Sequence, residues 1–240
     1  MGRGGGAVSM DGGGLKEPEP ASSIAPAIPG PAMPAGGQPG CLSPLEEVLA
    51  GHLSRSRPGS RLLLTCPYTR ILKVDMAVLR VLLGRRRERG IYVSIDRPHS
   101  FVQTALRKMG VPLDGLIFID AVSKLTGVRA EGSMVRFLSS GYSLPLLDDL
   151  FSRAYLPEGS QMHFVRLEDL SFVLLDNIAV MLQYTTLEKV RRTVNLLGEA
   201  VKKFTDMRAL ITLDPSVSPE LYSIVKGTCD RELPVMEAGL

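Results

Sequence analysis

The feature that most constrains the fold is the apolar run at 170–182, LSFVLLDNIAVML, which one aspartate, Asp176, interrupts. An apolar run of four to six residues without alternation indicates a strand buried on both faces, and such strands occur in parallel sheets covered by helices on each side. A carboxylate buried in mid-sheet would be costly in free energy. We therefore place Asp176 where the strand ends, at the edge of the sheet where open α/β folds bind their ligands.

Strands and helices alternate along the rest of the chain. The sequence predicts strands at 61–67, 91–96, 116–120 and 209–214, short strands at 134–138 and 162–167, and an edge strand at 233–236. It predicts helices at 73–89, 98–109, 144–155, 186–204 and 219–226. This alternation is typical of right-handed βαβ units and a parallel sheet.

The chain is predicted to have three parts. Residues 1–42 are rich in Gly, Pro and Ala with few large apolar side chains, so we expect a disordered tail. Residues 43–57 are expected to form a short helix and linker, with Ser43 as N-cap and Glu46 completing a capping box. We favour a helix docked on the domain over a free partner-binding helix. Residues 58–236 are predicted to be the main domain.

Composition excludes several classes of protein. The 240 residues are 45% hydrophobic, enough for one α/β core. Three cysteines without a CxxC pair predict a reduced, cytoplasmic protein, and the three scattered histidines lack zinc-ligand spacing. No apolar run is long enough to predict a membrane span.

Nucleic-acid binding is the weakest of the functions that we considered. The net charge of +3 is mild. A basic run, GRRRERG at 84–90, is expected mainly to complement the dipole of a helix C-terminus.

Aspartates follow four of the predicted strands: Asp96, Asp120, Asp176 and Asp214. If the strands are parallel, these carboxylates lie along one edge of the sheet. Clustered carboxylates suit Mg²⁺ and can raise one another's pKa, so we name Asp96, Asp120 and Asp176 as candidate metal ligands. The alternative is that each aspartate caps the turn or helix that follows its strand.

The order of elements over 61–235 resembles the RecA-like ATPase fold, in particular archaeal proteins similar to the clock ATPase KaiC. FVLLDN resembles the Walker B strand of that superfamily, and IYVSIDRP falls where KaiC-like enzymes carry two catalytic acids. The resemblance implies a three-layer RecA-like domain with a mainly parallel sheet. It also implies that Asp176 orients Mg²⁺ through water.

The departures from this family concern the phosphate-binding loop. A Walker A loop needs glycines whose amides cradle phosphate, followed by Lys and Ser or Thr. After the first strand this chain reads TCPYTRILKVDMA, in which Lys73 is followed by Val74, and Arg97 stands where a second acid is expected. We therefore expect a non-catalytic, P-loop-less module without a cofactor, which interacts with or regulates a protein partner such as a related ATPase. The alternative is an Mg-dependent nucleotide-binding protein or enzyme that holds ATP and Mg²⁺ through the edge carboxylates.

Overall fold

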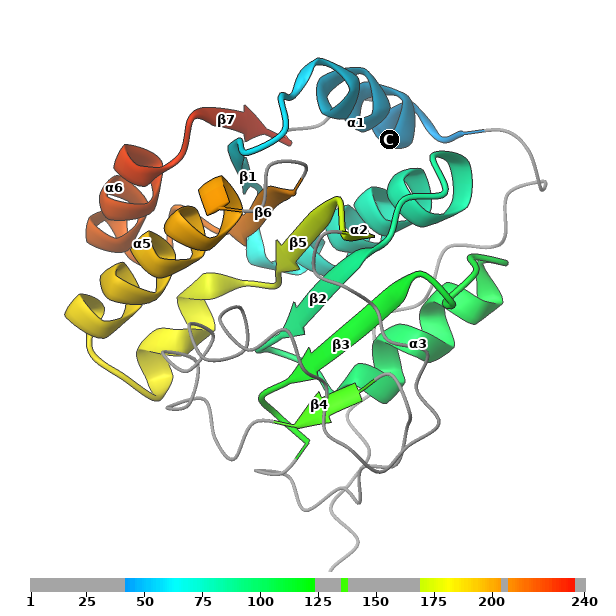
Figure 1. Cartoon of the computed structure of the whole chain (residues 1–240). Helices are drawn as coiled ribbons and strands as arrows, with labels where there is room; N and C mark the ends of the chain where they lie inside the picture. The colour runs from blue at the N-terminus through cyan, green and yellow to red at the C-terminus, as the bar shows by residue number, and fades with distance from the viewer. Residues whose placement is uncertain (1–41, 124–134, 138–168, 204–206, 236–240) are drawn as a thin grey trace, which may run out of the picture. The chain divides into compact units, whose positions relative to one another are not determined.

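The computed structural model describes residues 42–123, 135–137, 169–203 and 207–235 (Figure 1). All of them belong to one compact unit, Gly36–Leu240. The predicted tail, except Leu42, lies outside the described residues, as do the predicted helix at 144–155 and the predicted strand at 162–167. The boundaries of the three predicted parts stay predictions.

The centre of this unit is a seven-stranded sheet in the order β4-β3-β2-β5-β6-β1-β7, and each neighbouring pair is parallel. The strands are β1 (Arg61–Thr65), β2 (Gly90–Ser94), β3 (Leu116–Asp120), β4 (Val135–Phe137), β5 (Phe172–Leu175), β6 (Arg208–Leu213) and β7 (Arg231–Pro234). The strand predicted from the apolar run is β5, which lies in the middle of the sheet between β2 and β6. All carboxyl ends of the strands therefore meet at one edge of the sheet.

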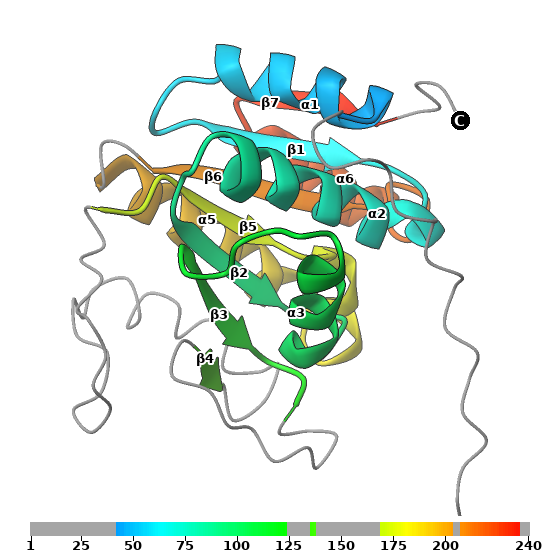
Figure 2. The ribbon, with the colours of Figure 1, turned by 90° about the vertical axis from the view of Figure 1, so that its right-hand side faces the viewer.

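Helices cover both faces of the sheet (Figures 1 and 2). They are α1 (Pro44–Arg55), α2 (Tyr68–Leu79), the π-helix η1 (Arg80–Arg85), α3 (His99–Lys108), the 3-10 helix η4 (Ile178–Gln183), α5 (Leu187–Lys203) and α6 (Pro219–Thr228). Helices α2 and α3 cover one face, and α5 and α6 cover the other (Figure 1). The predicted three-layer α/β architecture with a parallel sheet is confirmed.

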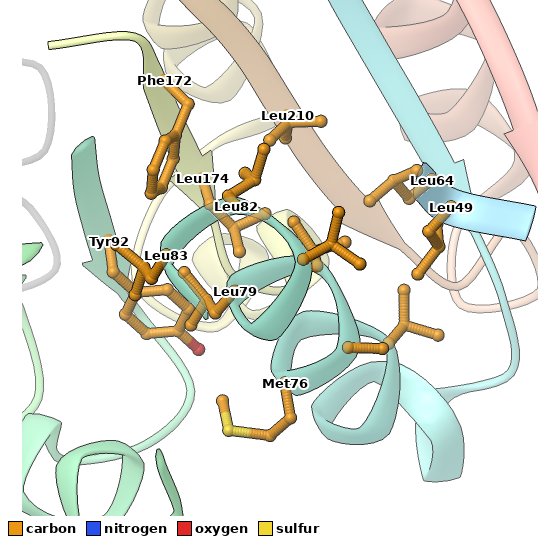
Figure 3. Close-up of a cluster of buried hydrophobic side chains, with 14 of the residues drawn as sticks. Leu49, Leu64, Met76, Leu79, Leu82, Leu83, Tyr92, Phe172, Leu174 and Leu210 are labelled. Atoms are coloured by element: carbon orange, nitrogen blue, oxygen red, sulfur yellow. The ribbon is translucent and has the colours of Figure 1, made fainter. Parts of the chain in front are cut away.

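The alternating side chains of each strand divide the core into two clusters. Leu63 of β1 packs in the cluster that includes Val190 and Val194 of α5, while its neighbours Leu62 and Leu64 pack in the cluster with α1, α2 and α3. Figure 3 shows the second cluster, in which leucines of α2 and η1 lie over aromatic and leucine side chains of β2, β5 and β6. Because both faces are buried, β1, β5 and β6 read as continuous apolar runs in the sequence.

Helix α1 has the predicted capping box and is docked. The Ser43 Oγ accepts from the Glu46 N–H at 3.3 Å, and the Glu46 carboxylate accepts from the Ser43 N–H at 2.8 Å. Glu46 also pairs with Arg80 of η1 at 3.1 Å. Leu49 and Leu53 are each only 1% exposed. The expectation that this helix packs against the domain is confirmed.

The predicted helix at 73–89 differs most from the structure. Helix α2 begins earlier, at Tyr68, and after Leu79 the chain widens into the π-helix, which ends at Arg85. Gly90 begins β2 instead of ending a helix. A Cβ there would lie 2.4 Å from the Phe172 ring, so the close approach of these two strands requires a glycine.

None of the helices in the described segments is both long enough and apolar enough to cross a membrane.

Candidate functional site

A group of buried and half-buried polar residues lies at the carboxyl edge of the sheet. We call it the carboxyl-edge cluster; its members are Asp75, Tyr92, Asp96, Arg97, Asp176 and Asn177. Asp176 and Asn177 follow β5, and Asp96 and Arg97 follow β2, the neighbouring strand. Asp75 reaches the cluster from the middle of α2.

Arg97 joins two of the predicted site residues. Its Nη2 lies 2.9 Å from the Asp96 Oδ2, and its Nη1 lies 3.5 Å from the Asp176 Oδ1. Burial by itself lowers the pKa of Arg97, but Asp176 and Asp96 raise it by more. The guanidinium therefore stays charged and supplies the positive charge that a fully buried Asp176 needs.

Asp75 and Asp176 form a buried pair of carboxyl groups, and each shifts the pKa of the other. Burial raises the pKa of Asp75 well above its usual range, and the nearby Asp176 raises it further. Burial also raises the pKa of Asp176 to about 6, although Arg97 opposes the shift. If both groups were ionised, Asp75 Oδ1 and both oxygens of Asp176 would have no hydrogen-bond donor among the described residues. A proton shared by the pair provides a donor and removes the repulsion between two carboxylates. The Tyr92 hydroxyl donates to the Asp75 Oδ2 at 3.4 Å.

Asn177 closes the cluster beside β6. Its backbone is in the left-handed region with φ 42°, which asparagine tolerates better than most residues. Its N–H donates to the Thr212 Oγ1 at 2.9 Å, and its Nδ2 donates to the Asp96 Oδ2 at 3.2 Å. The Tyr68 hydroxyl reaches the other Asp96 oxygen at 3.4 Å. The bonds from Asn177 and Tyr68 hold the Asp96 carboxylate, which also pairs with Arg97.

The connection from β1 to α2 consists of Cys66 and Pro67. The Cys66 N–H donates to the Leu213 carbonyl at 3.1 Å, and proline has no N–H to offer. The Tyr68 N–H, at the start of α2, donates to the Asp214 Oδ2 at 2.7 Å. Burial works against the ionisation of Asp214, but hydrogen bonds from Ser216 and Tyr68 lower its pKa. The chain's own carboxylate thus occupies the helix N-terminus, and these residues do not fit a phosphate cradle.

Asp120, the third predicted ligand, is engaged in a different arrangement. Its oxygens accept from the N–H groups of His99, Val122 and Ser123, and it also contacts the Ser123 hydroxyl and the His99 Nδ1, each at 2.6 Å. Burial raises the pKa of Asp120, but these hydrogen bonds lower it by more. The carboxylate therefore binds the start of α3 and the loop after β3, which is the capping role that the sequence left open.

The structure brings Asp96 and Asp176 together through Arg97, while Asp120 binds its own loop. Within the described ranges, no group of three or more His, Cys, Asp or Glu side chains is arranged to hold a metal ion. The assignment of Mg²⁺ to Asp96, Asp120 and Asp176 stays a prediction.

Sequence reasoning missed Asp75 and gave Arg97 no role. Asp75 is fully buried within the run VDMAVL of α2, where all neighbours are buried. A single acid in an otherwise apolar helical stretch was the available signal, because a buried carboxylate needs a partner.

Three exposed apolar side chains lie at the same edge of the sheet. Tyr68, Phe101 and Val217 are 47%, 42% and 53% exposed, and they follow β1, β2 and β6 respectively. We call these three residues the apolar edge patch. The strands β1, β6, β5 and β2 are consecutive in the sheet, so the patch extends over three interstrand spacings, about 15 Å.

No family model matches the sequence, and no curated protein matches it. Among solved structures, the chain is similar to the uncharacterized protein PH0321 from Pyrococcus horikoshii in complex with an unknown peptide, with 14% identity, a TM-score of 0.53, and coverage of 80% of this chain and 83% of that chain. It is also similar to PH0250 from Pyrococcus horikoshii OT3, with 11% identity, a TM-score of 0.52, and coverage of 80% and 89%. The KaiC-like protein PH0186 from the same archaeon has 13% identity, a TM-score of 0.49, and coverage of 76% of both chains.

Identities this low show the fold alone. Together with the parallel sheet and its two helical layers, the likeness to PH0321 and PH0250 confirms the predicted α/β fold with a parallel sheet between helices.

Proposed function

We propose that the protein is a non-catalytic, RecA-like interaction module with a degenerate phosphate-binding loop. The observation that supports this most is that the chain's own side chains fill both positions where a nucleotide and its cation would bind. The Asp214 carboxylate caps α2, and the Arg97 guanidinium pairs with Asp176. A bound nucleotide would have to displace this pairing, and separating buried charges is costly in free energy.

The apolar edge patch is the surface that we assign to a partner. Exposed tyrosine and phenylalanine side chains are enriched in protein interfaces. The partner in this proposal is a protein, such as a related ATPase, in the cytoplasm. PH0321, which is similar to this chain in fold, was solved with an unknown peptide bound and is a precedent for peptide binding by such a fold.

One observation favours a second candidate, an Mg-dependent nucleotide-binding protein. The two oxygens of Asp176 and the Asn177 Oδ1 are buried. Without a proton shared with Asp75, none of the three has a hydrogen-bond partner in the described part of the chain. Carboxylate and amide oxygens are ligands that Mg²⁺ prefers. For this function Arg97 would have to leave Asp176.

A calorimetric titration with MgATP separates the two candidates. The interaction module should show no affinity tighter than about 1 mM. Micromolar, Mg²⁺-dependent binding would support the second candidate instead. The variant Arg97→Ala is a useful comparison, because it removes the internal cation and leaves the β1–α2 connection unchanged.

Partner binding is measured by isolating the protein together with its bound partners from cells of the source organism. The double variant Tyr68→Ser, Phe101→Ser should lose a RecA-like ATPase that the parent protein retains. The matched control is Val48→Ser, because Val48 is similarly exposed, at 45%, but lies on α1. Retention of the same partner by the double variant would refute the assignment of this surface.

A further inference from the structure

A pocket of about 330 Å³ lies at the amino edge of the sheet, at the opposite ends of the strands from the carboxyl-edge cluster. One wall is the turn between η1 and β2, which contributes Arg87, Glu88 and Arg89. The other wall is the loop before β3, which contributes Pro112, Asp114 and Gly115. This volume is at the lower end of the range for small-molecule sites.

The turn that presents the arginines is held by backbone hydrogen bonds at alternate residues. The N–H groups of Arg86, Glu88 and Gly90 donate to the carbonyls of Val81, Leu82 and Gly115, at 3.0, 2.9 and 2.8 Å. The intervening residues are the two arginines of the pocket. Their backbone positions are therefore set before any ligand arrives.

Arg87 is in the left-handed region with φ 55°. This conformation is unfavourable for a residue with a Cβ, and such strain gathers at functional sites. The preceding π-helix, η1, is a second local irregularity of a kind often found beside such sites. A glycine at 87 would adopt this backbone conformation without strain. The strain of an arginine at this position is accounted for if the side chain binds a ligand.

Two acids and two arginines line the pocket, and among the described residues they are not paired with one another. The Glu88 carboxylate already accepts from the Arg86 Nε and from the Arg208 Nη2, the latter at 3.3 Å. In contrast, the side chains of Arg87 and Arg89 have no ion pair or hydrogen bond among the described residues. The pocket therefore offers two available guanidinium groups, with Asp114 as an exposed acceptor beside them.

We propose that this pocket binds the phosphate ester of a small polyhydroxy compound, such as a sugar phosphate. Two guanidinium groups suit the charge of a phosphate monoester, which they bind through paired N–H···O contacts. Leu83 and Pro112 supply an apolar wall for the carbon skeleton, and Asp114 can accept from a hydroxyl group. This site is independent of the proposed function at the other edge of the sheet.

The test uses the full chain, with ribose 5-phosphate and inorganic phosphate as probes in calorimetric titrations at constant ionic strength. We expect ribose 5-phosphate to bind more tightly than inorganic phosphate. Arg87→Gly should weaken binding about tenfold, because it removes charge-assisted hydrogen bonds. Without ligand the same variant should melt at a higher temperature than the parent, since glycine adopts a positive φ without strain.

The matched control is Arg85→Ala, since Arg85 is an exposed arginine of η1 that does not line the pocket. Its affinity for ribose 5-phosphate should equal that of the parent protein. An equal loss in Arg85→Ala and Arg87→Gly would refute the site by showing a diffuse charge effect. If the parent protein does not bind ribose 5-phosphate even at millimolar concentration, the site is refuted as well. Equal affinity for ribose 5-phosphate and inorganic phosphate would refute the proposal that the ligand is a phosphate ester.

Discussion

Asp75 lies in an environment that its side chain disfavours, because this acid is fully buried within α2. Its neighbour Asp176 is also fully buried, and the pKa of both carboxyl groups is raised. Folded chains therefore bind more protons than unfolded chains from about pH 4, the usual pKa of an aspartate, through about pH 6, the pKa of Asp176, and up to the raised pKa of Asp75. The contribution of the pair to stability is present at the acidic end of this window and is lost as the pH rises through it.

The substitution Asp75→Asn should restore the stability that the parent protein loses as the pH rises. Asparagine keeps the size of the side chain and can donate to Asp176 without titrating, so Asp176 can ionise against Arg97. We expect the free energy of unfolding at about pH 8 to rise by roughly 1–3 kcal/mol, and the decline between pH 4 and pH 6 to flatten. Urea unfolding at several pH values measures both effects.

Asp169→Asn is the control for this substitution, because Asp169 is exposed and should change little. The lowered pKa values of Asp120 and Asp214 affect stability only below about pH 4, so they do not obscure the window. A less stable Asp75→Asn at pH 8 would contradict the shared proton.

At the scale of elements, α1 shows how a short helix is held by a few contacts. Its capping box orders the first turn, the Glu46–Arg80 pair links it to η1, and Leu49 and Leu53 anchor it in the core. The intrinsic stability of a 12-residue helix is marginal, so these tertiary contacts supply most of its order.

Adjacent residues of α1 allow a matched pair of substitutions. Leu49→Ala should lower the free energy of unfolding by about 2–4 kcal/mol, because it leaves a cavity under the helix. Val48→Ala, at a position that is 45% exposed, should stay within about 0.5 kcal/mol of the parent. Chemical denaturation of both variants provides the comparison, and similar losses would mean that α1 is not docked through Leu49.

At the scale of the whole molecule, the three predicted parts should contribute unequally to stability. Residues 1–38 contain few large apolar side chains. Deleting them should change the melting temperature by no more than about 2 °C. Deleting residues 1–57 also removes α1 with Leu49 and Leu53, and should lower the melting temperature by roughly 10 °C. Calorimetric scans of the two truncated chains test the predicted boundaries, and equal melting temperatures would contradict them.

Local patterns in the sequence determined the elements and the type of sheet. The run FVLL predicted a strand buried on both faces, because such strands read as continuous apolar sequence. LIFID predicted β3 with its observed bounds, and Ser43 with Glu46 predicted the start of α1. The alternation of strands and helices predicted parallel pairing. In each case the signal lies within a few consecutive residues, where backbone sterics, hydrogen bonding and burial act directly.

Only the tertiary structure decided which side chains meet. Asp75 reaches Asp176, about a hundred positions further along the chain, because α2 packs on the face of the sheet that carries Leu174 of β5. Arg97, which follows β2, pairs with Asp176 at the end of β5. Asp214 contacts the first turn of α2 because β6, the strand before Asp214, lies beside β1. Arg87 and Arg89 face a pocket because the turn before β2 lies against the loop before β3. These contacts depend on strand order and helix packing, which arise from the burial of the whole sheet and leave no local pattern in the sequence.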